Sequence, residues 1–173
     1  MVYKAKEKTA AGNARSERPA ELPDAGKIAS ALEPVVQGLG FAILEFSVSR
    51  HDGRVQIRMV IARLPGAFGQ KTPSIGTAEV GRVHRSILPR LELALEGADF
   101  SVNCLSPGID RTIKEGAEFA YFLGSTVRCY LPEVSDWVRG VLKASDENKI
   151  ILENGDGEME LKYENIAKAK LDG

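Results

Sequence analysis

The side chains that most often carry catalysis are scarce in this chain of 173 residues. It has two histidines, His51 and His84, and two cysteines, Cys104 and Cys129. Both cysteines fall in expected strands, where a thiol behaves as a small buried apolar group. No phosphate-binding glycine loop, dinucleotide fingerprint, zinc-spaced Cys/His set or serine elbow occurs. The sequence therefore predicts a protein that is not an enzyme, with no catalytic residue, metal or cofactor.

The most informative run is Ser106-Pro107-Gly108-Ile109-Asp110-Arg111, which follows an alternating segment, 100–105, typical of a strand. Pro107 fixes φ near the value that the second residue of a turn needs, and Gly108 allows a positive φ at the third. We therefore expect a type II turn, with Ser106, Pro107 and Gly108 forming a rigid corner between two folding units.

The elements before this corner predict a two-layer domain. Asp24 can cap a helix that runs to about residue 38, although Pro34 should kink or split it. Two alternating strands follow, joined at Asp52-Gly53, which is a strong hairpin signal. A second helix is expected over 77–88, where Pro89 breaks the pattern, and the strand 100–105 closes the unit. The order is helix, strand, strand, helix, strand.

The elements after the corner are short strands with tight turns. A short helix ending at Gly124 is followed by about five strands, which predicts a small SH3-like or Sm-like barrel. Trp137 is expected in the barrel core, with an interface anchor as the alternative. The last strand, 166–171, carries Lys168 and Lys170, which would protect an exposed sheet edge. The fold class is therefore α+β, an α/β domain followed by an all-β barrel.

The domain boundaries follow from the change between a helix-containing pattern and a pattern of short strands. Residues 1–20 form a polar tail of net charge +3, expected to be disordered, with weak tethering to RNA as an open alternative. The α/β domain covers 21–106, a turn and linker cover 107–114, and the barrel covers 115–173. The whole chain has a formal net charge of −1, so it is not an overall basic nucleic-acid binder. No apolar run is long enough for a membrane helix, and a reducing cytoplasm suits the two isolated cysteines.

The chain resembles a known family, the bacterial ribosome maturation factors named RimP. The resemblance covers about residues 24–171. The motifs that carry it are Leu32-Glu33-Pro34-Val35 with Gly38-Leu39-Gly40, the run 106–111, Phe122-Leu123-Gly124, Gly140-Val141-Leu142 and the ending 166–171. The departures from the family pattern are at Gly76, Thr77, Asn103, Leu105 and Thr112.

The resemblance implies a cytoplasmic, monomeric protein without catalysis that helps to assemble the small ribosomal subunit. It implies two partners on the immature subunit, ribosomal RNA and the small-subunit protein at the decoding centre. The contact candidates are charged residues of the corner and the barrel: Asp110, Arg111, Lys114, Arg128 and Arg139. Arg111 could instead form an interdomain salt bridge. The rival hypothesis is an Sm-like regulator that forms rings and binds free RNA.

Overall fold

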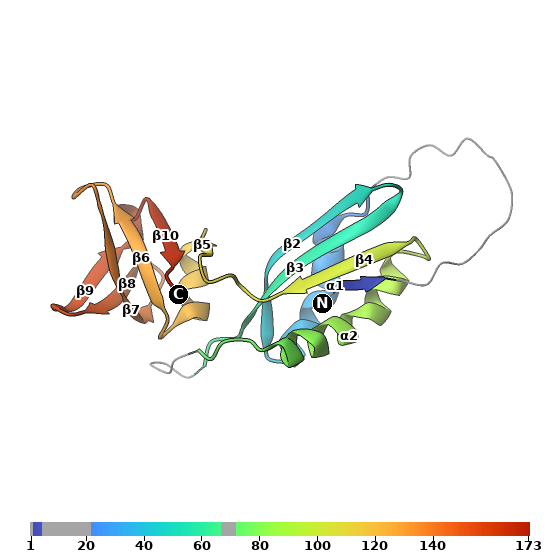
Figure 1. Ribbon diagram of the computed structural model, residues 1–173, viewed down its shortest axis with the longest axis horizontal. Coiled ribbons are helices and arrows are strands. Elements are labelled where there is room, and N and C mark those ends of the chain that lie inside the picture. The colour runs from blue at the N-terminus through green and yellow to red at the C-terminus, as the bar shows by residue number, and fades with distance from the viewer. Residues whose placement is uncertain (1, 5–21, 67–71) are drawn as a thin grey trace, which may run out of the picture. The chain divides into compact units, whose positions relative to one another are not determined.

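The computed structural model describes residues 2–4, 22–66 and 72–173. The chain forms two compact units (Figure 1). The first contains Met1–Ala62 and Ile75–Ser106, and the second contains Arg63–Ser74 and Pro107–Gly173. The segment before the second helix thus belongs to the second unit, where the sequence placed it inside the first domain. Its anchor is the Thr72 backbone N–H, which donates to the Leu123 carbonyl at 2.8 Å.

The first unit is a two-layer α/β structure. Its elements are β1 (Val2–Lys4), α1 (Ala25–Gly38), β2 (Phe41–His51), β3 (Arg54–Arg63), α2 (Thr77–Ala94) and β4 (Phe100–Leu105). The sheet order is β1-β4-β3-β2, with β3 and β4 parallel. One apolar core joins both helices to the sheet, and its fully buried members include Leu32, Val36, Ile57, Ile87 and Leu91.

Local sequence signals explain most of these boundaries. The Asp24 carboxylate accepts hydrogen bonds from the backbone of Gly26 and Lys27, so it caps α1 as predicted. Asp52 and Gly53 both have positive φ, 50° and 77°, which is the two-residue hairpin turn that their types predict. The hairpin between β2 and β3 is therefore confirmed.

Both prolines lie inside continuous helices, so Pro34 does not split α1, and the expected break of the second helix at Pro89 is wrong. Each proline removes the bond to the carbonyl four residues earlier, at Ser30 or Arg85. Pro34, Pro89 and the residues four before them are all exposed, so water can satisfy those carbonyls. Helix α2 therefore extends to Ala94, six residues past the predicted end at Leu88.

The amino-terminal tail is not disordered throughout. Residues Val2–Lys4 form β1 and pair antiparallel with Ser101–Asn103 of β4. The exposed edge of β4 offers unpaired backbone groups, and three residues are enough to use them without an apolar pattern. The rest of the predicted tail, residues 5–20, lies outside the described residues.

The second unit is mostly β. Its elements are β5 (Thr112–Ile113), the 3₁₀ helix η1 (Gly116–Phe122), β6 (Thr126–Leu131), β7 (Asp136–Ser145), β8 (Lys149–Asn154), β9 (Gly157–Lys162), η2 (Tyr163–Asn165) and β10 (Lys168–Leu171). They form one antiparallel sheet in the order β5-β10-β6-β7-β8-β9. Within the described ranges β5 and β9 do not pair, so the sheet is open and not a closed barrel.

The last strand is internal. β10 lies between β5 and β6, so the expectation that Lys168 and Lys170 protect a sheet edge is wrong. Sequence order placed the strand last, but its position in the sheet depends on pairing across the whole unit. The long edge is β9, and its exposed charged residues are Glu158, Glu160 and Lys162. These charges oppose edge-to-edge pairing with another chain.

The corner turn is displaced from its predicted position. Gly108 does not have a positive φ, so the expected type II turn with Gly108 at its third position is wrong. Instead, the Arg111 backbone N–H donates to the Gly108 carbonyl at 3.1 Å, and the turn covers Gly108–Arg111. Pro107 then lies before the turn, where its fixed φ keeps the chain extended.

No helix in the described part of the chain combines the length and apolarity needed to cross a membrane.

Gly140 and Gly108 provide a matched test of packing. A Cβ at Gly140 would lie 2.9 Å from the Glu153 carbonyl oxygen and 3.0 Å from the Leu152 Cβ, whereas one at Gly108 meets nothing within 4 Å. We expect Gly140→Ala to lower the free energy of unfolding by about 1–3 kcal/mol. Gly108→Ala should leave it unchanged or raise it by up to about 1 kcal/mol. Denaturant unfolding measures both, and equal effects would contradict the close approach of β7 and β8.

His84 predicts a pH dependence of stability. It is buried, and burial is the main reason that its pKa lies below the ordinary value of 6.5. His84 therefore binds a proton more readily in the unfolded chain than in the folded protein. Its contribution to the free energy of unfolding is fully present above about pH 6.5 and is lost as the pH falls below that value. His84→Gln should reduce the change in melting temperature between pH 7.5 and 5.5. The same change in the parent and in His84→Gln would contradict the prediction.

Candidate functional site

One face of the second sheet carries two of the candidate side chains, Arg128 and Arg139, together with other basic and aromatic residues. Residues alternate along a strand, and Val127, Cys129, Leu142 and Ala169 point into the core. The residues between them point outward, and the register places Arg128 opposite Arg139 and Tyr130 opposite Trp137. On the other side of β6, Lys170 lies opposite Arg128 and Lys168 opposite Tyr130. We call these six residues the basic-aromatic face: Arg128, Tyr130, Trp137, Arg139, Lys168 and Lys170.

Trp137 belongs to this face and not to the core, so the core prediction is wrong. Trp137 is 40% exposed to solvent. Gly140 and Leu142 on β7 point inward, so Trp137, at odd spacing from both, must point outward. The Arg128 guanidinium lies 5.4 Å from its ring centroid, within the range of a cation–π contact. The Tyr130 ring packs beside it at 5.5 Å.

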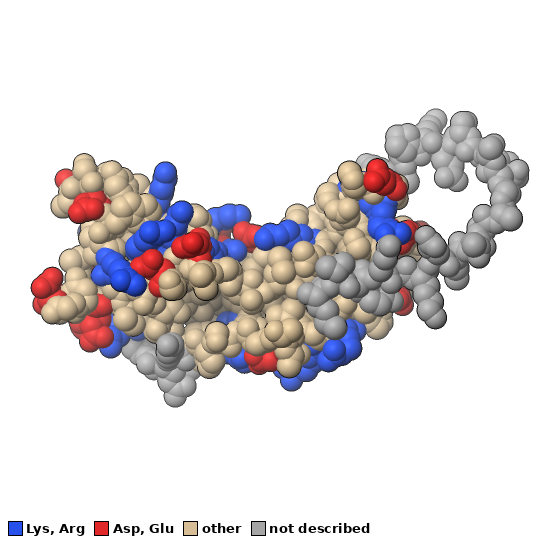
Figure 2. Space-filling view, in the orientation of Figure 1, with Lys and Arg blue, Asp and Glu red and all other residues tan. Residues whose placement is uncertain are grey.

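The charge of the face is positive. Arg128 Nη2 lies 3.7 Å from an Asp110 carboxylate oxygen, and Arg139 pairs with Asp172. Lys168 and Lys170 have no carboxylate partner within the described part of the chain. Figure 2 shows basic side chains close together over the part of the second unit that contains β6 and β10. Four cations against two carboxylates make this a local basic surface on a chain of net charge −1.

Arg111 has a different role from its neighbours in the corner. Its Nη2 lies 3.2 and 3.1 Å from the two carboxylate oxygens of Glu118, and the two side chains are only 7% and 12% exposed. Both residues belong to the second unit, so this ion pair is not the interdomain bridge considered from sequence. A side chain so buried offers little surface to a partner. Asp110 and Lys114 lie on either side of it and are exposed.

Tyr163 holds three segments of the second unit together. Its hydroxyl lies 2.8 Å from the Asp146 carbonyl and 3.1 Å from the Gly116 carbonyl, and its single proton can donate to either. Its ring stacks on Phe119 at 5.7 Å. Burial, followed by the charge of Asp146, raises the pKa of Tyr163, so the phenol stays a donor.

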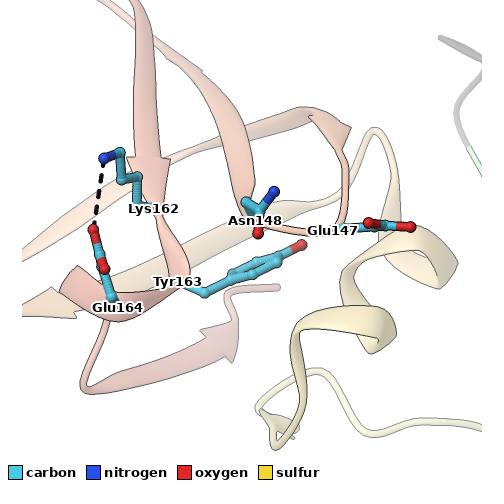
Figure 3. Close-up of a pocket in the computed structure, with 5 residues that line it drawn as sticks. All are labelled: Glu147, Asn148, Lys162, Tyr163 and Glu164. Atoms are coloured by element: carbon cyan, nitrogen blue, oxygen red, sulfur yellow. Dashed lines mark ion pairs between the residues drawn. The ribbon is translucent and has the colours of Figure 1, made fainter.

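A pocket of about 440 Å³ lies beside this tyrosine, lined by Glu147, Asn148, Lys162, Tyr163 and Glu164 (Figure 3). Lys162 and Glu164 pair with each other at 3.6 Å. The pocket thus presents carboxylates, an amide and one ammonium group. None of these is an activated nucleophile, and the tyrosine is already engaged with the backbone. The pocket is explained by the packing of the β7–β8 turn against η2.

The two cysteines lack the surroundings of a reactive thiol. Burial raises the pKa of Cys104 to about 11 and that of Cys129 to about 12, so both thiols stay protonated at neutral pH. Both are buried and free, as the sequence predicted. Among the described residues, no group of His, Cys, Asp and Glu side chains could hold a metal ion.

Comparison with known proteins identifies relatives. No family model matches the chain. The ribosome maturation factor RimP of Borrelia hermsii is 26% identical over 151 residues, which cover 87% of this chain and 98% of the relative. RimP of Borrelia turicatae is 27% identical over 153 residues, with the same coverage of both chains. RimP of Borrelia garinii is 27% identical over 140 residues.

These relatives share one name, and the match includes both units and nearly the whole length of the first two relatives. Alignment through both units matters because a shared small β domain alone would match only half of each chain. The chain is therefore similar, through both units, to the ribosome maturation factors named RimP.

Proposed function

We propose that this protein is a cytoplasmic ribosome maturation factor that binds the immature small ribosomal subunit and assists its assembly without catalysis. The observation that carries the proposal is the shared name of relatives matched through both units. The proposed partners are ribosomal RNA and the small-subunit protein at the decoding centre. The second unit is proposed to be a variant of the SH3-like or Sm-like barrels, consistent with its short antiparallel strands and the irregular β7–β8 register.

The distribution of charge supports docking through a defined surface. A chain of net charge −1 gains little from general attraction to RNA, so contacts must come from places where cations collect. The basic-aromatic face and the exposed corner residues Asp110 and Lys114 meet this need. Arg111 is proposed to position the corner through Glu118 and not to contact the particle itself.

The alternative is an Sm-like regulator that acts on free RNA. The exposed Trp137 of the basic-aromatic face favours it, because single-stranded RNA stacks its bases on aromatic side chains. Ring formation would require sheet edges that pair between copies, and the exposed residues of β9 include Glu158, Glu160 and Lys162. We therefore propose a monomer, and the molecular mass in solution separates the two functions.

Co-sedimentation with ribosomal particles tests the proposal. The protein should migrate with free small subunits from cell extract and not with translating ribosomes. Lys114→Glu with Arg139→Glu should weaken this association by about tenfold or more, because charge-assisted contacts contribute about 1.5–3 kcal/mol each. Arg85→Glu with Arg90→Glu, exposed on α2 of the first unit, reverses the same number of charges and is the control.

A deletion strain provides the second test. Loss of the protein should leave precursor small-subunit RNA and a deficit of mature small subunits. Normal subunit ratios with fully processed RNA would contradict the maturation role, whatever the purified protein binds.

A further inference from the structure

We propose that the basic-aromatic face binds single-stranded RNA, with one unpaired base stacked on Trp137 and phosphates held by Lys168, Lys170 and Arg139. The proposal rests on the proposed function for the source of the RNA, the immature subunit, and adds the contact surface and the form of the ligand.

The aromatic side chains supply the base-binding element. Trp137, the only tryptophan of the chain, is 40% exposed. Tyr130 and Arg128 pack against it, which limits its rotamers before any ligand arrives. A large ring held in place at the surface is a stacking platform, since every nucleobase has a π face.

The cations supply the phosphate-binding element. Lys168 and Lys170 are two residues apart on β10 and therefore project from the same side of the sheet, roughly 7 Å apart along the strand. Across β6 the register forms two neighbouring rows of opposed residues: Lys170, Arg128 and Arg139 in one, and Lys168, Tyr130 and Trp137 in the other. A nucleic-acid strand with a base stacked on Trp137 would thus have basic groups beside its backbone in the neighbouring row.

The two carboxylates at the edge of the face keep the arginines in position. Asp110 contacts Arg128, and Asp172 contacts Arg139. Both arginines are more than one third exposed, so their remaining N–H groups can reach phosphate oxygens without complete desolvation of the ion pairs. The face is therefore arranged in advance and loses less side-chain entropy on binding.

The chemistry favours single-stranded RNA over other partners. A duplex keeps its bases stacked on one another and presents phosphates alone, so it would not use the exposed indole. An acidic protein segment would use the cations but would leave the tryptophan without a matching ring. Unpaired nucleotides use both elements.

Intrinsic fluorescence tests the proposal directly, because Trp137 is the only tryptophan. A twelve-nucleotide oligouridine should quench the emission of the full-length protein, and a blunt RNA duplex of the same length should not. Log affinity for the single strand should fall with log salt concentration with a slope near −0.7 for each phosphate neutralised.

Variants locate the site, with binding followed by anisotropy of labelled oligouridine. Trp137→Leu should weaken binding by about 5- to 150-fold. Lys168→Gln with Lys170→Gln should reduce the magnitude of the salt slope by about 1.4. Arg85→Gln with Arg90→Gln on α2 should change neither, and equal losses in all variants would overturn the proposal.

The outcomes separate this inference from the proposed function. If oligouridine leaves the fluorescence unchanged while the parent still co-sediments with small subunits, the RNA inference is wrong and the maturation role stands. If Trp137→Leu abolishes co-sedimentation although oligouridine does not bind, the face docks on a ribosomal protein, which also overturns the inference. If oligouridine binds at this face but nothing co-sediments, the maturation role fails and the RNA site remains.

Discussion

The alternation of residues in β6, β7 and β10 is the constraint on which the second unit depends. Val127, Cys129 and Ala169 are packed in the core, and a shift of one residue in any register would bring charged groups into it. The same constraint that buries these small apolar side chains forces Arg128, Tyr130 and the two lysines of β10 onto the opposite side. Core packing and the composition of the outer face are therefore set by one pattern.

Buried polar contacts fix the ends of this sheet. The Arg111–Glu118 pair joins the corner to η1, and the Leu171 backbone N–H donates to the Arg111 carbonyl at 2.9 Å. Tyr163 joins η2 to the β7–β8 turn. Removing one partner of a buried ion pair leaves an uncompensated charge, which costs more than the pair itself contributes. These contacts hold β5 and β10 beside β6, so they position the basic-aromatic face without belonging to it.

Sequence reasoning succeeded where the signal was local. Asp52-Gly53 specified a hairpin and Asp24 specified a helix cap, because both depend on residues within one turn of each other. The helices continue through Pro34 and Pro89 because a missing helix bond costs little when the freed carbonyl is solvated, and exposure depends on the folded structure as a whole. The turn predicted at Gly108 was wrong for a related reason. Pro107 and Gly108 suit several positions of a turn, and the hydrogen bond from the Arg111 N–H to the Gly108 carbonyl makes Gly108 the first residue of the turn.

The candidate site was only partly predictable. Arg128 and Arg139 were named from sequence as basic residues of the second unit, but nothing in the chain order indicated that they face each other. The sequence favours the barrel core for Trp137, and its outward position follows only from the strand, in which it lies an odd number of residues from the inward-facing Gly140 and Leu142. Lys168 and Lys170 joined the site because β10 inserts between β5 and β6. The strand order is a property of the assembled sheet and could not be read from single strands.

Hydrogen–deuterium exchange of the protein alone and bound to purified immature small subunits tests the central claim, that the basic-aromatic face is the surface that docks. The account predicts slower exchange in peptides covering 126–139 and 166–172 on binding, with smaller changes in α1 and β2. Protection confined to the first unit, with unchanged exchange in β6, β7 and β10, would contradict it.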